Sequence, residues 1–168
     1  MKYEVIDNFL DEESFASLVT LITNKEKTSN TIMPWYFASN IAYPGVIEDK
    51  LFYMMHLFYH NNVPRSSHYE KLIPLFKKLK IECLLRVKAN LYPNTETLHE
   101  HPMHWDYSYS HSAAILSLNT CDGYTKLKDG TKIDSVANRI LLFDASEEHC
   151  STNTTNVSAR INININYF

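Results

Sequence analysis

The first half of the chain carries hydrophobic residues at helical spacing. In the first predicted helix they recur at intervals of three and four residues: Phe15, Leu18, Val19 and Ile22. The same spacing predicts a second helix over 51–59 and a third over 69–79. Proline, glycine and polar residues between the first two helices indicate connecting segments, with one brief strand at 35–37. We therefore expect residues 1–81 to form a mostly helical support, with a short strand just before its first helix.

From about residue 82 the hydrophobic period changes to two, which is typical of strands. Eight short strand-like segments continue to the C-terminus: 82–92, 97–106, 112–119, 124–127, 131–134, 138–143, 147–151 and 158–167. Helices followed by short antiparallel strands indicate an α+β chain that is mainly β. The expected architecture is a double-stranded β-helix, or jelly roll, braced by helices on one face. With 168 residues, we expect a single domain over 1–168 whose jelly-roll core is 82–168.

Two of the predicted strands have a polar face opposite a hydrophobic one. The polar positions are Arg86, Lys88, Asn90 and Tyr92 in one strand and Arg160, Asn162, Asn164 and Asn166 in the other. In an ordinary half-exposed sheet these faces would contact solvent. If the hydrophobic faces pack on the helices instead, the polar faces line the space between sheets, where Arg and Asn need an anionic, hydrogen-bonding ligand. The pattern alone leaves both arrangements open.

Composition excludes several function classes. Sixteen basic and nineteen acidic residues give a net charge of -3, so general attraction to nucleic acid or to an anionic membrane is not expected. The three glycines are too sparse for a dinucleotide fingerprint or a P-loop. Three distant cysteines, an acidic N-terminal segment and the absence of a long apolar run predict a cytoplasmic protein with reduced thiols and no membrane partner.

The eight histidines offer candidate metal ligands. An Fe(II) oxygenase centre needs two imidazoles and one carboxylate on one face of an octahedron. A His-x-Asp pair on an extended segment directs both side chains to the same face, and His104 and Asp106 form such a pair. About one such pair is expected by chance, and His68 with Glu70 is a second. That pair begins a helical segment, in which residues i and i+2 do not face each other.

Residues later in the chain strengthen the interpretation of His104 and Asp106 as metal ligands. His149 comes after an apolar strand and a short turn, and Arg160 lies eleven residues later on the polar face of the last strand. In this order the chain resembles the 2-oxoglutarate/Fe(II)-dependent oxygenase superfamily, most closely its prolyl-4-hydroxylase-like branch. That family has His-x-Asp, a distal His, and Arg or Lys about ten residues beyond it. The resemblance extends to VIDNFLDEESF, RVKANLYP, DGYTKLKDGTKI and ANRILLFD, and bacteriophage-encoded members are particularly similar.

The resemblance implies a role for each of these positions. It makes His104, Asp106 and His149 the iron ligands and catalytic centre, and Arg160 the partner of the distal carboxylate of 2-oxoglutarate. A guanidinium suits that role because it offers two parallel donors to a carboxylate held away from water. The resemblance also suggests cosubstrate contacts and residues at a substrate entrance. Asn90 and Tyr92 resemble cosubstrate-binding residues of several members, and Asn162 is either a cosubstrate contact or a support for the metal ligands. Thr125 is a further candidate, and the entrance candidates are Trp105, Tyr107 and Tyr109.

The implied activity is a dioxygenase of the hydroxylase type. It would consume O2 and 2-oxoglutarate, release succinate and CO2, and hydroxylate an unidentified protein, peptide or small molecule, with ascorbate as a candidate reductant for the iron. Family members that halogenate lack the carboxylate ligand, so Asp106 favours hydroxylation. Two alternatives stay open. One is a nucleic-acid oxidative demethylase, favoured by Asn90 and Tyr92 but opposed by the net charge of -3; the other is a non-catalytic jelly-roll module that binds a metal.

The remaining polar candidates have simpler interpretations. His99 and His101 are loop or surface imidazoles, substrate contacts, supports for the metal ligands, or a different metal site with His104. Helix surfaces or loops are expected for His56, His60 and His111. We expect solvated turn carboxylates at Glu147 and Glu148, and a core position at Cys150.

Overall fold

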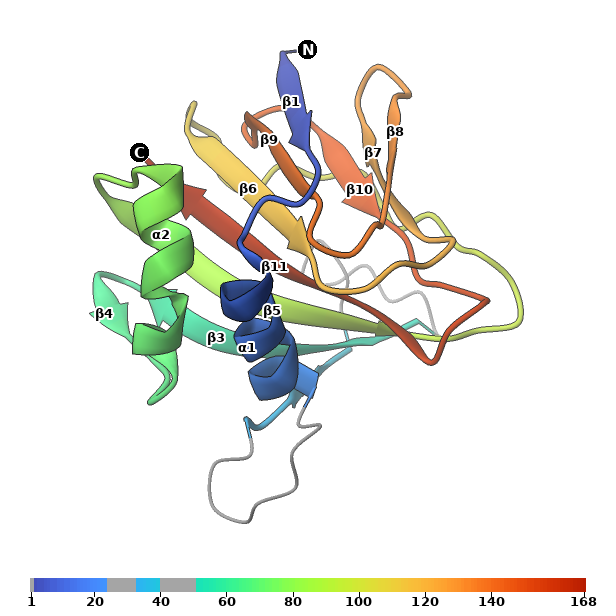
Figure 1. Ribbon diagram of the computed structural model, residues 1–168. Helices are drawn as coiled ribbons and strands as arrows, with labels where there is room; N and C mark the ends of the chain where they lie inside the picture. Colours follow the sequence, from blue (N-terminus) through green and yellow to red (C-terminus); the bar gives the residue numbers. More distant parts are fainter. Residues whose placement is uncertain (1, 24–32, 40–50) are drawn as a thin grey trace.

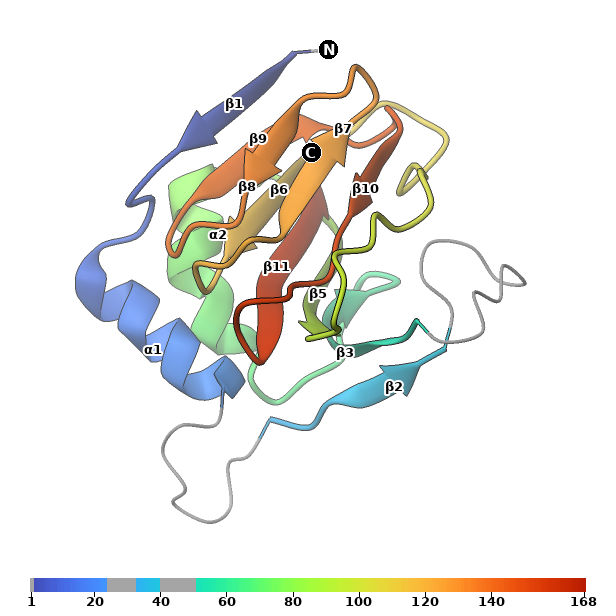
Figure 2. The same cartoon turned by 90° about the vertical axis from the view of Figure 1, so that its right-hand side faces the viewer.

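The strands form two antiparallel sheets. A computed structural model describes residues 2–23, 33–39 and 51–168. The larger sheet has the order β1-β9-β6-β11-β5-β3-β2, with β4 also paired to β3, and the smaller has the order β10-β7-β8. The bounds in the larger sheet are β1 (Tyr3–Ile6), β9 (Ile140–Asp144), β6 (Ser112–Ser117), β11 (Ala159–Tyr167), β5 (Leu84–Pro93), β3 (Tyr53–His60), β2 (Tyr36–Ala38) and β4 (Val63–Pro64). Those in the smaller are β10 (His149–Ser151), β7 (Tyr124–Leu127) and β8 (Lys132–Asp134), which lie in front of β6 and β11 in Figure 2.

Two helices cover one face of the larger sheet, as Figure 1 shows. They are α1 (Glu12–Thr23) and α2 (Ile73–Leu79), the latter preceded by a 3-10 turn, η1 (Tyr69–Leu72). The backbone N–H of Ser14 donates to the Asp11 carboxylate at 2.8 Å, which caps α1. Side chains of both helices share one hydrophobic core with β5 and β11: Leu18, Ile22, Leu75, Phe76, Val87, Ala89, Ile163 and Ile165. The helices predicted near 11–22 and over 69–79 are therefore confirmed, and they lie on one face as expected.

Because strands alternate, this core fixes the direction of the opposite faces of β5 and β11. The polar side chains of both strands point into the space between the two sheets. The buried ones include Asn90, Arg160, Asn162, Asn164 and Asn166. The interior arrangement of these polar faces is thus confirmed, and the solvent-facing alternative is wrong.

The predicted helix over 51–59 is wrong, because Tyr53–His60 forms strand β3 between β5 and β2. The pairing of β3 with β5 shifts register between Leu57 and Tyr59. This irregularity interrupts the period of two and leaves a spacing that resembles a helix. The segment is rich in aromatic residues, which favour strands. The chain before residue 82 is therefore not mostly helical, since it also contributes β1 to β4 to the sheet.

The predicted strand over 97–106 is also wrong. This segment makes only isolated bridges, from Glu100 to Thr152 and from His104 to His149. Pro102 lies between them and lacks the N–H that a continuous ladder needs. The other seven strand segments after residue 82, and the brief strand near 35–37, are confirmed with small differences in bounds. Within the described ranges, we find no helix with the length and apolar character that a bilayer crossing requires.

Candidate metal centre

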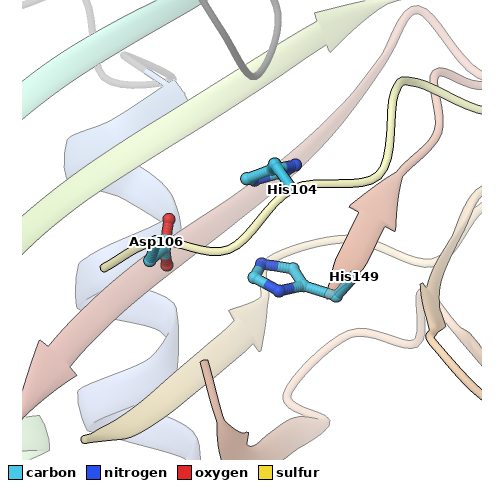
Figure 3. A group of neighbouring side chains, drawn as sticks. All are labelled: His104, Asp106 and His149. Carbon is cyan, nitrogen blue, oxygen red and sulfur yellow. The ribbon is translucent and has the colours of Figure 1, made fainter. Parts of the chain in front are cut away.

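Three side chains that can bind a metal converge at the pocket between the sheets. His104 and Asp106 lie in the irregular segment between β5 and β6, and His149 begins β10. The backbones of His104 and His149 exchange two hydrogen bonds of 2.9 Å, and the N–H of Asp106 donates to Ala145 at 3.0 Å. Ligand atoms of the three side chains all lie within 4.8 Å of one another, and Figure 3 shows the side chains grouped together. No other such group occurs among the residues that the structure describes.

Both imidazoles have the protonation that metal binding requires. Nδ1 of His104 lies 3.2 Å from the Pro102 carbonyl, and Nδ1 of His149 lies 3.1 Å from the Glu147 carbonyl. Since a carbonyl only accepts, each Nδ1 carries the proton and each Nε2 presents a lone pair. Burial, reinforced by the charge of His149, lowers the pKa of His104 to about 4. Burial also lowers the pKa of His149. Both rings are therefore neutral near pH 7.

Asp106 is held as an ionised carboxylate. Arg86 donates from Nη2 to Oδ1 at 2.6 Å, and Asn164 donates from Nδ2 to Oδ2 at 3.3 Å. Burial opposes ionisation, but the positive charges of Arg86 and Lys88 outweigh it and hold the pKa of Asp106 well below its usual value. The site thus offers two neutral nitrogens and one anionic oxygen, a set that suits Fe(II).

A chain of buried hydrogen bonds continues behind Asp106. Asn166 donates to the Asn164 side-chain oxygen at 2.8 Å, and His111 Nε2 lies 2.8 Å from the Asn166 oxygen. His111, which precedes β6, is therefore a loop residue as expected, and it is buried. Through this chain the last strand fixes the orientation of the Asp106 carboxylate.

Arg160 is a buried cation whose protein partners are neutral. Its side chain is 1% exposed. It donates to the Thr152 carbonyl at 3.1 Å and to the Thr125 hydroxyl at 3.0 Å, and its guanidinium carbon lies 5.7 Å from the Tyr92 ring centroid. The buried Nε of Arg160 has no hydrogen-bond partner, and no carboxylate in the described part of the chain pairs with this guanidinium. Such a cation is costly unless an anion joins it, so the residue fits a bound carboxylate.

The other predicted cosubstrate residues line the same pocket as the three metal-ligand candidates. Asn90 donates to the Asn162 side-chain oxygen at 2.9 Å, and burial raises the pKa of Tyr92 to about 12, so its phenol stays neutral. The structure therefore brings every predicted metal and cosubstrate residue together. The residues that line this pocket are Lys88, Asn90, Tyr92, His104, Asp106, Ile115, Thr125, His149, Cys150, Ser151, Asn162 and Asn164.

His101 and His99, which precede His104 in the same segment, differ in burial. His101 is buried, its Nδ1 lies 2.9 Å from the Ser151 hydroxyl, and its ring centroid lies 5.1 Å from that of Tyr92. Burial lowers its pKa to about 3. It supports the Tyr92 ring, so its interpretation as a surface imidazole is wrong. His99 is exposed and contacts Thr97, and the alternative metal site that combined it with His101 is not formed.

Two of the remaining histidines, His56 and His60, lie in a strand. His56 is buried in β3, where its nitrogens lie 2.7 Å from the Pro34 carbonyl and 2.8 Å from the Ser66 hydroxyl. It is therefore not on a helix surface, and neither is His60, the last residue of the same strand. Cys150 is buried as expected. Glu147 is exposed, and Glu148 forms an ion pair with Lys128 at 3.6 Å.

Aromatic residues lie beside the metal-ligand candidates. Trp105 is 44% exposed and Tyr109 is 46% exposed, so both can contact a molecule arriving from solvent. The rings of Tyr107 and Tyr109 stack at 5.4 Å, and the Arg86 guanidinium lies 5.3 Å from the Tyr107 centroid. This position is compatible with the predicted substrate entrance.

The site residues that the sequence did not single out are Arg86, Asn164 and Gly123. A Cβ on Gly123 would lie 2.4 Å from the Asn153 carbonyl oxygen and 2.7 Å from Cδ of Arg160. Only glycine therefore leaves room for the Arg160 side chain in its present position. The signal for Arg86 and Asn164 is their place on the polar faces of β5 and β11, but nothing in the sequence indicates a role for Gly123.

Comparison with solved structures decides the fold. A prolyl hydroxylase from Trichoplax adhaerens, solved with a peptide fragment of the hypoxia inducible factor oxygen degradation domain, matches with a TM-score of 0.69. The match covers 99% of this chain and 83% of that one, at 15% identity. The chain has the prolyl hydroxylase fold.

Two further structures share the prolyl hydroxylase fold. A Pseudomonas putida prolyl-4-hydroxylase matches with a TM-score of 0.61 at 14% identity, over 98% of this chain and 91% of that one. The viral collagen prolyl hydroxylase of Paramecium Bursaria Chlorella virus-1, solved as a 2OG complex, matches with a TM-score of 0.60 at 14% identity, over 99% and 94%. No family model and no curated protein matches the sequence. The predicted helix-braced jelly roll is confirmed by these likenesses.

Proposed function

We propose that this protein is a 2-oxoglutarate- and Fe(II)-dependent dioxygenase that hydroxylates a protein side chain, a peptide or a small molecule. One observation carries the proposal: two neutral imidazoles and one carboxylate converge in the pocket beside a buried guanidinium that lacks a carboxylate partner among the described residues. The nitrogen and oxygen donors suit Fe(II). The charge and burial of Arg160 suit one end of a dicarboxylic acid.

Each residue has a distinct task in this proposal. Bound Fe(II) and 2-oxoglutarate would supply the oxidising chemistry. His104, Asp106 and His149 would hold the metal, while Arg86 and Asn164 keep the Asp106 carboxylate oriented. Arg160, with the Thr125 hydroxyl beside it, would hold the far carboxylate of the cosubstrate. Asn90, Tyr92 and Asn162 would shape the pocket between these ends and exclude water.

Succinate formation tests the proposal without knowledge of the substrate. The protein supplied with Fe(II), ascorbate, O2 and 2-oxoglutarate is expected to form succinate slowly, and removal of the metal with a chelator is expected to stop it. Mass spectrometry measures succinate in the reaction mixture with and without the chelator. Metal binding without any succinate would instead indicate the non-catalytic binding module.

The substrate is proposed to approach along Trp105, Tyr107 and Tyr109. These aromatic side chains lie next to the metal-ligand candidates, and two of them are partly exposed to solvent. The Trichoplax prolyl hydroxylase was solved with a peptide fragment, which makes a peptide one reasonable substrate for this pocket. The jelly roll itself is compatible with many substrates.

Gly123→Ala provides a test of the cosubstrate end of the pocket. The added methyl group overlaps backbone and the Arg160 stem, so we expect a loss of stability of about 1–3 kcal/mol and a fall in 2-oxoglutarate affinity of about tenfold. Thermal unfolding and a 2-oxoglutarate titration measure the two effects.

Gly130→Ala is the matched control. Gly130 has a φ of +89° and no heavy atom within 4 Å of an added Cβ, so substitution there should cost stability of about 1 kcal/mol and leave 2-oxoglutarate affinity unchanged. Unchanged affinity in Gly123→Ala would contradict the tight contact with Arg160.

A further inference from the structure

Lys88 is a further cation at the pocket, and it forms no ion pair with the residues that the structure describes. Lys88 lies on the polar face of β5, is partly buried, and lines the pocket together with His104, Asp106 and His149. Its Nζ lies 5.7 Å from the Tyr53 ring centroid. In the described ranges no carboxylate comes within 4.0 Å of this ammonium. The nearest acid in the pocket, Asp106, is already paired with Arg86.

The charge balance of the pocket leaves room for an anion. The pocket and the side chains bonded to its lining contribute three cations: Lys88 in the lining, Arg86 paired with Asp106, and Arg160 bonded to Thr125. They contribute one carboxylate, Asp106. Fe(II) would add two positive charges and 2-oxoglutarate would add two negative ones. The loaded pocket would therefore keep an excess of two positive charges. Because charge in a partly dry site is costly when unpaired, a further anion is favoured there.

Strand register separates this cation from the cosubstrate end. Arg160 lies opposite Tyr92, whereas Lys88 lies opposite Asn164, the residue that contacts Asp106. Four residues along β5 span roughly 13 Å, which is longer than a five-carbon diacid. A cosubstrate held at Arg160 therefore leaves Lys88 at the Asp106 end of the pocket. Lys88 lies there beside Arg86, whose guanidinium is 5.3 Å from the Tyr107 ring centroid at the proposed entrance.

Arg86, beside Lys88, adds a further hydrogen-bond donor. Arg86 is two residues from Lys88 on the same face, and its buried Nε has no hydrogen-bond partner although its Nη2 is paired with Asp106. Two adjacent cationic side chains with unused donors are typical of a site that binds carboxylate or phosphate.

We infer that Lys88, assisted by Arg86, binds an anionic group of the primary substrate, so the substrate of the proposed oxygenase is a carboxylic acid or a phosphate ester. This inference rests on the proposed function. It goes further because it selects a chemical class of substrate. It also places the binding site for the anionic group of that substrate next to the metal-ligand candidates.

Simple anions test the site in protein loaded with Zn(II), a diamagnetic substitute for Fe(II), and 2-oxoglutarate. Acetate and methyl phosphate are titrated while the side-chain NMR signal of Lys88, assigned from its loss in Lys88→Arg, is followed. We expect at least one anion to shift this signal to saturation below about 100 mM, and acetamide, the neutral analogue of acetate, not to shift it. The anion that saturates first distinguishes a carboxylic acid from a phosphate ester.

Two variants separate Lys88 from other anion sites, with the Asn164 side-chain amide signal as the reporter. Lys88→Met should weaken anion binding by at least about tenfold, while Lys88→Arg keeps most of it. Equal anion affinity in Lys88→Met, or no saturable shift in the wild type, would overturn the inference. A loss of 2-oxoglutarate affinity as large as the loss for the anion would assign Lys88 to the cosubstrate and also overturn it. Succinate formation by the wild type reports the proposed function separately.

Discussion

His149→Ala is expected to abolish Fe(II)-dependent turnover of 2-oxoglutarate. The imidazole is one of three ligand atoms that lie within 4.8 Å of one another, so its loss leaves two donors for the metal. Loss of a group that only supports a ligand already costs about 10–100-fold, and loss of the ligand itself should exceed that. Succinate formation and Fe(II) affinity, measured on the same preparation, quantify the effect.

The substitution should leave the fold in place. The hydrogen bonds between His149 and His104 run through their backbones and survive the change to alanine. His99→Ala is the control, because His99 is an exposed histidine in the segment that carries His104. Its ring contacts Thr97, and its bond to Asn153 runs through the backbone N–H, which the substitution keeps. Turnover in His149→Ala equal to that of the control would refute the assignment of this ligand.

Arg160→Met is expected to separate cosubstrate binding from stability. Without its guanidinium, the affinity for 2-oxoglutarate should fall by at least about 30-fold, because the far carboxylate would be buried without a partner. Stability without 2-oxoglutarate should be equal or higher, since methionine replaces a buried charge whose protein partners are neutral. Calorimetric titration and thermal unfolding measure the two quantities.

Arg139→Met is the matched control for this experiment. Arg139 forms its ion pair with Asp7 at 2.6 Å near the surface, away from the pocket. Its replacement should not change 2-oxoglutarate affinity. If Arg160→Met binds 2-oxoglutarate as tightly as Arg139→Met, the cosubstrate role of Arg160 is wrong.

The clearest of the correctly predicted strands, β11, has two chemically different faces. In β11, isoleucine alternates with arginine and asparagine, because one face packs on the helices and the other lines the pocket. The pattern in β3 was misinterpreted because both of its faces are partly covered and its pairing with β5 shifts register after Leu57. The period of two is clearest where burial differs consistently between the two faces of a strand, and β3 lacks that difference.

The metal-ligand candidates were predictable because their signal is local or follows a known order. His104 and Asp106 are two residues apart, and Arg160 follows His149 by eleven residues, close to the spacing of about ten in the family that the chain resembles. The supports of Asp106 were not predictable, because Arg86 and Asn164 reach it only after β5 and β11 pair in one register. The sequence shows both residues on polar faces, but only the register shows which of those positions lie beside the metal-ligand candidates.

The most direct test of the central claim is an anaerobic titration followed by visible absorption. Fe(II) is added to the protein first and 2-oxoglutarate second, so that no turnover occurs. The account predicts that His104, Asp106 and His149 hold iron next to a cosubstrate that is bound by Arg160. A metal-to-ligand charge-transfer band should then grow until one 2-oxoglutarate is bound per chain. A protein that binds both components and develops no such band would contradict the account.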